Sequence, residues 1–600
     1  MYRSINHNAA PVTMNYNLNN TANPAQKTST LAALRKLFQF LAAEQKTLIM
    51  AFITIMISSG LNLTGPVITA YTIDHFIQDH QYNKVLLACG ALLLIYFTAF
   101  GANYLQARLM GNIGQRMLFN LRNAVFSKLT ELPVAFFNQN KAGDLISRIN
   151  NDTERVNQFF SQYLMQFVSN IFLMTGAGIF LLTLHPQLGA AALGPALLLF
   201  VFTRLISPWV RRKNTAYMQS TGNMSAEIQE SLNNFKVILA FNRRDYFRKR
   251  FDEVNRRNYA TATAAGLANS TFMPVFGFCS QLAQLIVLTY GIYLIAGGHL
   301  TIGVLISYLA YVNSFYTPIR QLSVLWANFQ VALAGWDRIS QILSLQSDLP
   351  LIPAKDNGDA AAAVIEFKQV QFRYPDSKPV LHNVNFRLER GKTYALVGPT
   401  GGGKTTTASL IARLYDPTEG EVLLEGRDIR SYDAAARSSK IGFILQEPFL
   451  FTGTVKDNIL YGNPQYADYS NEQLLEVIRE AKLESLLVRF EQGLDTKVQT
   501  SGDSVSLGQK QLIAFIRAVL RRPQLLILDE ATANIDTITE QLLEKILQQL
   551  PEDTTRVIIA HRLNTIENAD EIFFVNAGEV IRAGSLDHAV NMLLHEKRAS

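Results

Sequence analysis

Cysteine is scarce in this sequence. Only Cys89 and Cys279 occur among the 600 residues, and each lies inside a long apolar stretch. Two isolated thiols in apolar surroundings argue against a disulfide framework and against a thiolate metal site. They also leave no candidate nucleophile for a cysteine protease domain near the N-terminus.

Charge is also scarce, and it is unevenly distributed. Charged residues make up 17% of the chain and hydrophobic residues 48%, which is a low charge content for a soluble protein. Asp, Glu, Lys and Arg are absent from residues 47–73, 85–107, 156–203 and 258–319. A membrane helix needs roughly 20 apolar residues, so the first two stretches are each long enough for one span and the last two for a pair.

Each of the two longer stretches contains a turn signal. The segment LHPQLG at 184–189 carries proline and glycine, and GGHLTIG at 297–303 carries three glycines. Such residues favour a short connection between two helices. The sequence therefore predicts six membrane helices.

Basic residues indicate how these helices are oriented. They gather between the second and third spans, over residues 108–148, and between the fourth and fifth, over residues 204–250. The positive-inside rule places both segments and both termini in the cytosol. The net charge of +7 also raises the possibility of nucleic acid binding, but the basic residues lie where membrane topology already requires them. We therefore expect no nucleic acid partner.

The N-terminal region lacks the apolar run of a secretory signal. Residues 1–30 are rich in asparagine, and we expect them to form a disordered cytosolic tail. The segment that follows has four apolar residues on one helical face, Leu34, Leu37, Phe38 and Leu41. Two interpretations remain open: an amphipathic helix at the membrane interface, or the cytosolic start of the first span.

The composition changes again near residues 345–363. This segment contains proline, glycine, aspartate and alanine, and its apolar residues show no helical or strand periodicity. This segment is a predicted linker after a transmembrane domain over 31–344. Residues 364–600 begin with β-rich runs such as VIEFKQVQFRY and then alternate strands with helical segments. The expected fold is a six-helix membrane domain followed by an α/β P-loop ATPase cassette.

A phosphate-binding loop follows the first β-rich runs of this second domain. The sequence GPTGGGKT at 398–405 matches GxxxxGK[ST], between the strand-like TYALV and a helix-like segment. In such a loop the glycines admit backbone N–H groups to the phosphates, the lysine reaches the β and γ oxygens, and the threonine hydroxyl binds Mg²⁺. The predicted ATP-binding residues are Gly398, Gly401, Gly402, Gly403, Lys404, Thr405 and Thr406.

Two acids follow the apolar run LLIL. We expect Asp529 to hold Mg²⁺ and Glu530 to polarise the attacking water as general base. Paired acids after an apolar strand are common by themselves. The preceding phosphate loop, and the motif SVSLGQKQL before the acids, favour the catalytic interpretation over surface acids.

Taken together, these motifs resemble an exporter-type half-transporter of the ATP-binding cassette superfamily, over nearly the whole chain after the tail. The resemblance implies that Tyr374 stacks on adenine, although a buried strand tyrosine is the alternative. It implies that Gln446 reaches Mg²⁺ and the attacking water, that His561 is the switch histidine, and that Asp536 crosses the dimer axis.

The resemblance also implies a second half-transporter as partner. Ser506, Gly508 and Gln509 match the signature motif, which in this family completes the ATP site of the other cassette at a helix N-terminus. Two intracellular loops, at about 109–155 and 204–257, resemble those that carry a short coupling helix against the cassettes.

The sequence departs from the family pattern in two places. The signature has Val505 and Leu507 at positions where other residues are more common, although its serine, glycine and glutamine remain. In QTSGDS, Thr500 or Ser501 stands where many homodimeric exporters carry a glutamate. With Glu530 retained, this loss favours a heterodimer in which the present chain supplies the competent glutamate; neutral drift in a homodimer is the alternative.

The predicted spans contain no charged residue to pair with a charged substrate. Their polar and aromatic residues suit a cavity for amphipathic drugs or lipids, but they suit helix packing equally well. The residues in question are Asn62, Asn170, Gln281, Gln284, Tyr308, Tyr311, Asn313 and Phe315.

Three function classes follow from these features. An ATP-driven exporter of hydrophobic or amphipathic compounds is the first, with membrane lipids around it. A lipid or lipid-linked flippase is the second, and it would require basic residues at the cavity mouth. An ATP-gated channel or regulatory subunit is the third, and Glu530 and His561 argue against it because a gate needs ATP binding more than turnover. The half-transporter plan suits a bacterial inner membrane.

Overall fold

The structure is a computed structural model that describes residues 15–18, 44–347, 349–353, 363–375, 377–499, 505–529, 537–559, 568–584 and 588. The chain divides into two compact units. One comprises Met1–Ala22, Thr130–Ala142 and Leu345–Ser600, and the other Asn23–Leu129 and Gly143–Ser344. The amphipathic face predicted at 34–41 lies outside the described residues.

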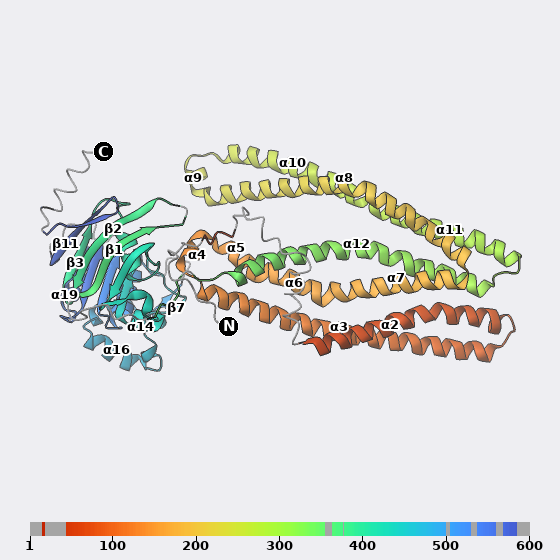
Figure 1. The fold of residues 1–600 in the computed structure, drawn as a ribbon, viewed down its shortest axis with the longest axis horizontal. Helices are drawn as coiled ribbons and strands as arrows, with labels where there is room; N and C mark the ends of the chain where they lie inside the picture. Colours follow the sequence, from red (N-terminus) through yellow and green to blue (C-terminus); the bar gives the residue numbers. More distant parts are fainter. Residues whose placement is uncertain are drawn as a thin grey trace. The chain divides into compact units, whose positions relative to one another are not determined.

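The helical unit confirms the six predicted spans. Within the described ranges, six helical segments are long and apolar enough to cross a membrane. The two predicted turns are present, because α7 ends at Leu184 before Pro186, and α11 ends at Ala296 before Ile302. The long helices run alongside one another (Figure 1). Their bounds are α2 Gln45–Thr72, α3 Tyr82–Glu131, α7 Leu164–Leu184, α8 Pro186–Asn233, α10 Arg244–Ser270, α11 Phe272–Ala296 and α12 Ile302–Ser344.

Several of these helices are much longer than a bilayer is thick. At about 1.5 Å per residue, the 50 residues of α3 and the 48 of α8 exceed a hydrocarbon core of about 30 Å more than twofold. Most of the predicted intracellular loops is therefore helix. Short elements remain where coupling helices were expected: α4 Val134–Gln139, α5 Ala142–Ser147, α6 Thr153–Gln158 and α9 Phe235–Ala240.

The tyrosines of α12 pack helices together. Tyr308 and Tyr311 are fully buried, and their hydroxyls donate to the carbonyl oxygens of Leu181 and Leu63, each at 2.6 Å. These bonds satisfy carbonyls of α7 and α2, so the rings join three helices. For both tyrosines, packing is the correct interpretation and a place on a substrate cavity is not.

The other polar candidates in the spans are placed differently. Gln284 donates to Asn313 Oδ1 at 2.9 Å, which joins α11 to α12. Asn170 is buried, and its Nδ2 lacks a hydrogen-bond partner among the described residues. Asn62 and Gln281 are exposed on this single chain. None of these positions by itself defines a substrate site.

Three sheets are formed by the described residues of the cassette. A four-stranded antiparallel sheet has the order β2-β1-β4-β5, and a six-stranded, mostly parallel sheet has the order β12-β11-β3-β10-β9-β6. A small pair joins β7 and β8. The strands are β1 Ala363–Arg373, β2 Pro379–Glu389, β3 Thr393–Val397, β4 Glu419–Leu424, β5 Arg427–Asp428, β6 Ile441–Ile444, β7 Gly453–Thr454, β8 Lys497–Val498, β9 Leu525–Asp529, β10 Thr555–Ile559, β11 Glu571–Asn576 and β12 Glu579–Arg582.

The central strands of the six-stranded sheet are buried on both faces. Every residue of β3 and β9 is buried, as expected for parallel strands that read as continuous apolar runs. The predicted α/β cassette is therefore confirmed. The cassette helices are α13 Lys404–Ile411, α14 Ala434–Lys440, α15 Val455–Leu460, α16 Asn471–Glu480, α17 Glu484–Leu487, α18 Leu507–Val519 and α19 Thr537–Gln548.

Candidate active site

Four strands that precede predicted site residues end at one edge of the six-stranded sheet. Strands β3, β10, β9 and β6 are neighbours and all parallel, so their carboxyl ends meet at this edge. β3 runs directly into Gly398, and β9 ends on Asp529. β6 ends two residues before Gln446, and β10 ends two residues before His561. The strand order thus brings together four strand ends that lie far apart in the sequence.

The phosphate loop depends on glycine for its backbone. Gly403 has φ +116° immediately before α13, a left-handed conformation that side chains disfavour. Gly398 has φ +145°, and a Cβ there would lie 2.0 Å from the carbonyl oxygen of Val575 on β11. The loop therefore curls around the N-terminus of α13, where unpaired backbone N–H groups favour anions.

The lysine of the loop is bonded within the loop, and the threonine hydroxyl is close to the carboxylate at the end of β9. Lys404 is 6% exposed, and its Nζ donates to the carbonyl oxygens of Gly398 at 2.8 Å and Pro399 at 3.1 Å. Thr405 Oγ1 donates to Asp529 Oδ1 at 3.5 Å, and Asp529 is buried. A hydroxyl and a carboxylate at this separation offer two hard oxygen ligands of the type Mg²⁺ prefers beside nucleotide phosphates.

An aromatic cluster flanks the loop. Tyr374 forms a hydrogen bond of 3.1 Å with Thr406 Oγ1, so its ring lies beside the start of α13. Edge-to-face contacts join it to Phe372, at a centroid distance of 4.9 Å, and to Tyr415, at 5.2 Å. Tyr374 remains partly exposed and is therefore not the fully buried strand tyrosine of the alternative interpretation.

Tyr415 and Asn138 were not predicted from the sequence. Asn138, in the coupling helix α4, donates from Nδ2 to the Tyr415 hydroxyl at 2.8 Å. The coupling helix thus contacts the aromatic cluster at the phosphate loop. The motif RLYDP after α13 contains Tyr415, but no sequence pattern pairs it with residue 138 across more than 270 positions.

Beside Tyr415, the linker is fastened to the cassette. The Arg413 guanidinium donates to the carbonyl oxygen of Pro350 at 2.7 Å and to Asp416 at 2.9 Å. Burial raises the pKa of the Asp416 carboxyl, and the Arg413 guanidinium opposes that rise. The first part of the predicted linker is therefore held in place on the cassette, while residues 354–362 lie outside the described ranges.

The signature residues form a helix cap. Ser506 precedes α18, its Oγ accepts from the N–H of Gln509 at 3.2 Å, and Gln509 Oε1 accepts from the N–H of Ser506 at 2.9 Å. This reciprocal capping box fixes the first turn of the helix, which also contains Gly508. The cap leaves the remaining N–H groups of the first turn to face a ligand.

Some of the predicted residues fall outside the described part of the chain. Glu530, Asp536 and His561 are among these, as are Thr500 and Ser501 before the signature. Gln446 is described and exposed just beyond β6. In the sequence, Glu530 directly follows β9 and His561 lies two residues after β10. The roles of these residues, of Asp536 and of Gln446 are predictions.

One family model matches the membrane helices of this chain and another matches its cassette. Residues 48–319 match the ABC transporter transmembrane region, and residues 381–533 match the ABC transporter family. A curated relative, the fatty acid ABC transporter ATP-binding/permease protein of Mycobacterium bovis, is 33% identical over 508 residues, covering 85% of this chain and 80% of that protein. The chain belongs to the ABC transporters.

Other relatives of this ABC transporter chain carry different substrate names. A putative multidrug export ATP-binding/permease protein of Bacillus subtilis is 28% identical over 568 residues, covering 94% of this chain and 97% of the relative. An ATP-dependent lipid A-core flippase of Syntrophus aciditrophicus is 29% identical over 541 residues, covering 89% and 88%. The family resemblance is therefore confirmed, and it does not select a substrate.

The plan of the chain follows from these findings. One set of six membrane helices and one ATP-binding cassette make it an exporter-type half-transporter. It is an ATPase coupled to transport across a membrane.

Proposed function

We propose that this ABC half-transporter exports hydrophobic or amphipathic compounds across a bacterial inner membrane, driven by ATP hydrolysis. The observation that carries the proposal is the sheet edge that combines Lys404, Thr405 and Asp529 in a chain with six apolar spans. The spans lack charge, which suits an uncharged or amphipathic substrate rather than an ion.

In the proposed ATP site, each residue has a defined task. Tyr374 stacks on adenine, Lys404 binds the β and γ phosphates, and Thr405, Asp529 and Gln446 hold Mg²⁺. When bound, Mg²⁺ neutralises charge on the phosphate oxygens. No cluster of three metal-binding side chains occurs among the described residues, in keeping with a metal held largely by phosphates and water.

Two further residues act on water and phosphate in this proposal. Glu530 accepts a proton from the attacking water, and His561 contacts the γ-phosphate. Ser506, Gly508, Gln509 and Asp536 complete the ATP site of a second cassette. The first three lie at the capped start of α18, whose dipole favours a phosphate.

A second half-transporter also fits two surfaces of this chain. The coupling helix α9 exposes Phe235 and Val237 by more than half, and Phe241 follows it with 74% exposure. The cassette has a largely apolar groove of about 470 Å³, lined by residues including Phe443, Phe449 and Tyr461, next to Gln446. We propose that α9 of each chain fills the groove of its partner, because exposed apolar patches mark interaction sites.

We further propose that the partner is a different chain. The support is the QTSGDS segment, which lacks the glutamate found before the signature in many homodimeric exporters, together with retention of Glu530. In such a heterodimer, this chain supplies the competent catalytic glutamate and a sister chain has the weaker site.

The first test is the mass and ATPase rate of this chain purified alone in lipid bilayers. We expect a folded protein with little or no ATPase activity alone, and activity on co-expression with the sister chain from the neighbouring gene. Thermal unfolding of the isolated chain is the control for misfolding. A homodimer whose ATPase activity is abolished by Glu530→Gln would contradict the heterodimer and leave the exporter proposal intact.

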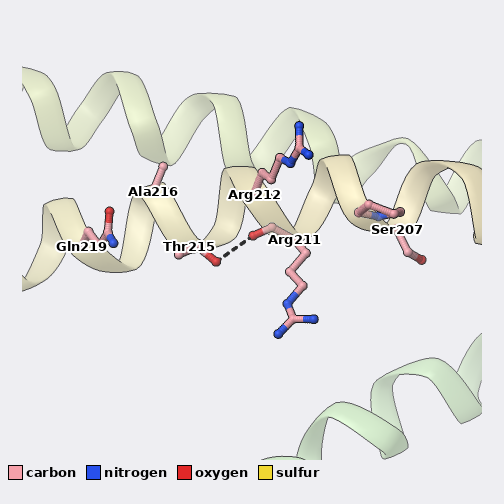
Figure 2. Close-up of a pocket in the computed structure, with 7 residues that line it drawn as sticks. Ser207, Arg211, Arg212, Thr215, Ala216 and Gln219 are labelled. Atoms are coloured by element: carbon pink, nitrogen blue, oxygen red, sulfur yellow. Dashed lines mark hydrogen bonds between the residues drawn. The ribbon is translucent and has the colours of Figure 1, made fainter.

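One structural feature favours the flippase alternative. The uncharged part of α8 ends at Thr203, and just beyond it a groove of about 540 Å³ is lined by Ser207, Pro208, Arg211, Arg212, Thr215, Ala216 and Gln219. Figure 2 shows the two arginine side chains leaving the helix in different directions. Both are exposed, and neither forms an ion pair among the described residues. Basic groups at this depth suit lipid headgroup phosphates.

Removing these two charges tests the lipid alternative. Each basic residue near an anionic surface contributes about 1 kcal/mol, so Arg211→Gln with Arg212→Gln should weaken anionic lipid binding about 30-fold. The measurement is ATP-driven translocation of fluorescent phosphatidylglycerol in proteoliposomes as its fraction is raised. Arg248→Gln with Lys249→Gln, two exposed basic residues of α10 outside the groove, is the matched control. Equal translocation by both double variants would exclude a headgroup role for the groove.

A further inference from the structure

A short stretch of the N-terminal tail is packed in the cassette unit. Tyr16 is 1% exposed, and its ring meets that of Phe136 in α4 edge-to-face at 6.2 Å. The sequence predicted disorder for the whole of residues 1–30, and Asn15–Leu18 depart from that expectation. Between Tyr2 and Phe38, Tyr16 is the only phenylalanine, tyrosine or tryptophan of the chain.

The main chain of the tail pairs with the end of the coupling helix. The N–H of Tyr16 donates to Gln139 Oε1 at 2.8 Å. Asn140 donates from Nδ2 to the carbonyl oxygen of Tyr16 at 2.9 Å and accepts from the N–H of Leu18 at 3.0 Å. Asn140 is 7% exposed, and it also donates to the carbonyl oxygen of Phe136 at 2.8 Å. The buried side-chain amide of Asn140 thus binds the main chain of the tail through both its Nδ2 and its Oδ1, at the end of α4.

The hydroxyl of the same tyrosine reaches a third segment. Tyr16 Oη donates to the carbonyl oxygen of Gln346 at 3.0 Å, two residues after α12 ends. The tail therefore joins the coupling helix to the first residues of the linker. A buried hydroxyl and a buried ring on one side chain make Tyr16 specific for this place.

The other side of α4 leads to the ATP site. Asn138 contacts the Tyr415 hydroxyl, the Tyr415 ring contacts Tyr374, and Tyr374 bonds to Thr406 at the start of α13. All of these residues belong to the compact unit that contains the cassette and the tail. The coupling helix is consequently held between the tail on one side and the aromatic cluster of the phosphate loop on the other.

We propose that Asn15–Leu18 is a built-in docking segment that holds α4 on the cassette, with Tyr16 as its anchor. Through α4, Tyr16 is a positioning residue that keeps Asn138 against Tyr415. Loss of the anchor frees the coupling helix while the phosphate-binding residues stay in place. The effect on coupling rests on the proposed ATP-driven cycle, whereas the docking itself does not.

Hydrogen exchange in the full-length transporter, without nucleotide, tests the docking. Tyr16→Ala should raise the exchange rate of amides 134–140 by about tenfold or more, because a ring contact and a hydroxyl bond are lost together. Tyr16→Phe, which keeps the ring and loses only the bond to Gln346, should give a smaller increase. Tyr2→Ala is the control within the same tail and should give none. Equal exchange in wild type and Tyr16→Ala would overturn the docking.

ATP binding then tests the positioning role. In wild type, ATP with Mg²⁺ should slow exchange in α5, the helix that follows the coupling helix. In Tyr16→Ala this ATP-induced protection should fall by about half or more, while the Kd for ATP changes less than about twofold. Unchanged protection would overturn the role of Tyr16 in coupling. Failure of ATP to bind wild type would instead contradict the proposed function, and the nucleotide-free measurement would still decide the docking.

Discussion

Glu530→Gln should lower the steady-state rate of ATP hydrolysis by roughly 10²–10⁴-fold while ATP remains bound. Glutamine has the shape of glutamate but cannot accept a proton from the attacking water. Glu530 directly follows Asp529 in the sequence, and Asp529 ends β9 beside Thr405, so we expect the base to lie next to the phosphates and the Mg²⁺ ligands. With hydrolysis blocked, two ATP molecules should keep the cassettes closed on each other.

The measurement combines phosphate release with retention of labelled ATP on gel filtration. The matched control is Glu579→Gln, an exposed glutamate on β12 of the same sheet, which should hydrolyse ATP at the wild-type rate. In a heterodimer, the sister chain must be present in both preparations. Near wild-type turnover in the Glu530 variant would remove this residue from the role of base.

Lys404→Ala should weaken ATP binding about 10- to 150-fold. A hydrogen bond to a charged group contributes about 1.5–3 kcal/mol, and Lys404 is the charged group of the phosphate loop. Its Nζ donates to the carbonyl oxygens of Gly398 and Pro399, so the ammonium is already held inside the loop where the β and γ phosphates are expected. The Kd of a fluorescent ATP analogue measures the effect.

The same two bonds also hold the loop together, and a second variant separates the two roles. Lys404→Met keeps most of the buried stem and removes the charge, so it should lose ATP affinity as alanine does. Lys497→Ala, an exposed lysine on β8, should bind ATP as wild type does. Wild-type affinity in Lys404→Met would show that packing, and not phosphate binding, explains the alanine result.

Much of the fold could be predicted from local sequence patterns. Uncharged stretches predicted six spans because a bilayer cannot solvate charge, and proline and glycine marked the turns after Leu184 and Ala296. Apolar runs predicted β3 and β9 because parallel strands are buried on both faces. The intracellular loops were less predictable. They are polar, yet α3 and α8 continue through them as helix, and α10 packs along α8.

The aromatic residues of the sixth span show what local sequence patterns cannot predict. Tyr308 and Tyr311 lie on one helical face, which suits a cavity and a packed interface equally. Only their bonds to carbonyl oxygens of α7 and α2 decide for packing. A hydroxyl has no preferred partner in sequence, since the choice depends on which carbonyl the fold brings within reach.

The sequence by itself determined the chemistry at the ATP site and the number of membrane spans. A phosphate loop needs glycine, lysine and threonine in fixed order, and a span needs an uninterrupted apolar run, so both are local properties. The tertiary structure decided what lies beside the loop. The contacts of Tyr16 with α4 and of Asn138 with Tyr415 join residues more than 100 positions apart. Such contacts depend on how packed elements meet, and no spacing along the chain encodes them.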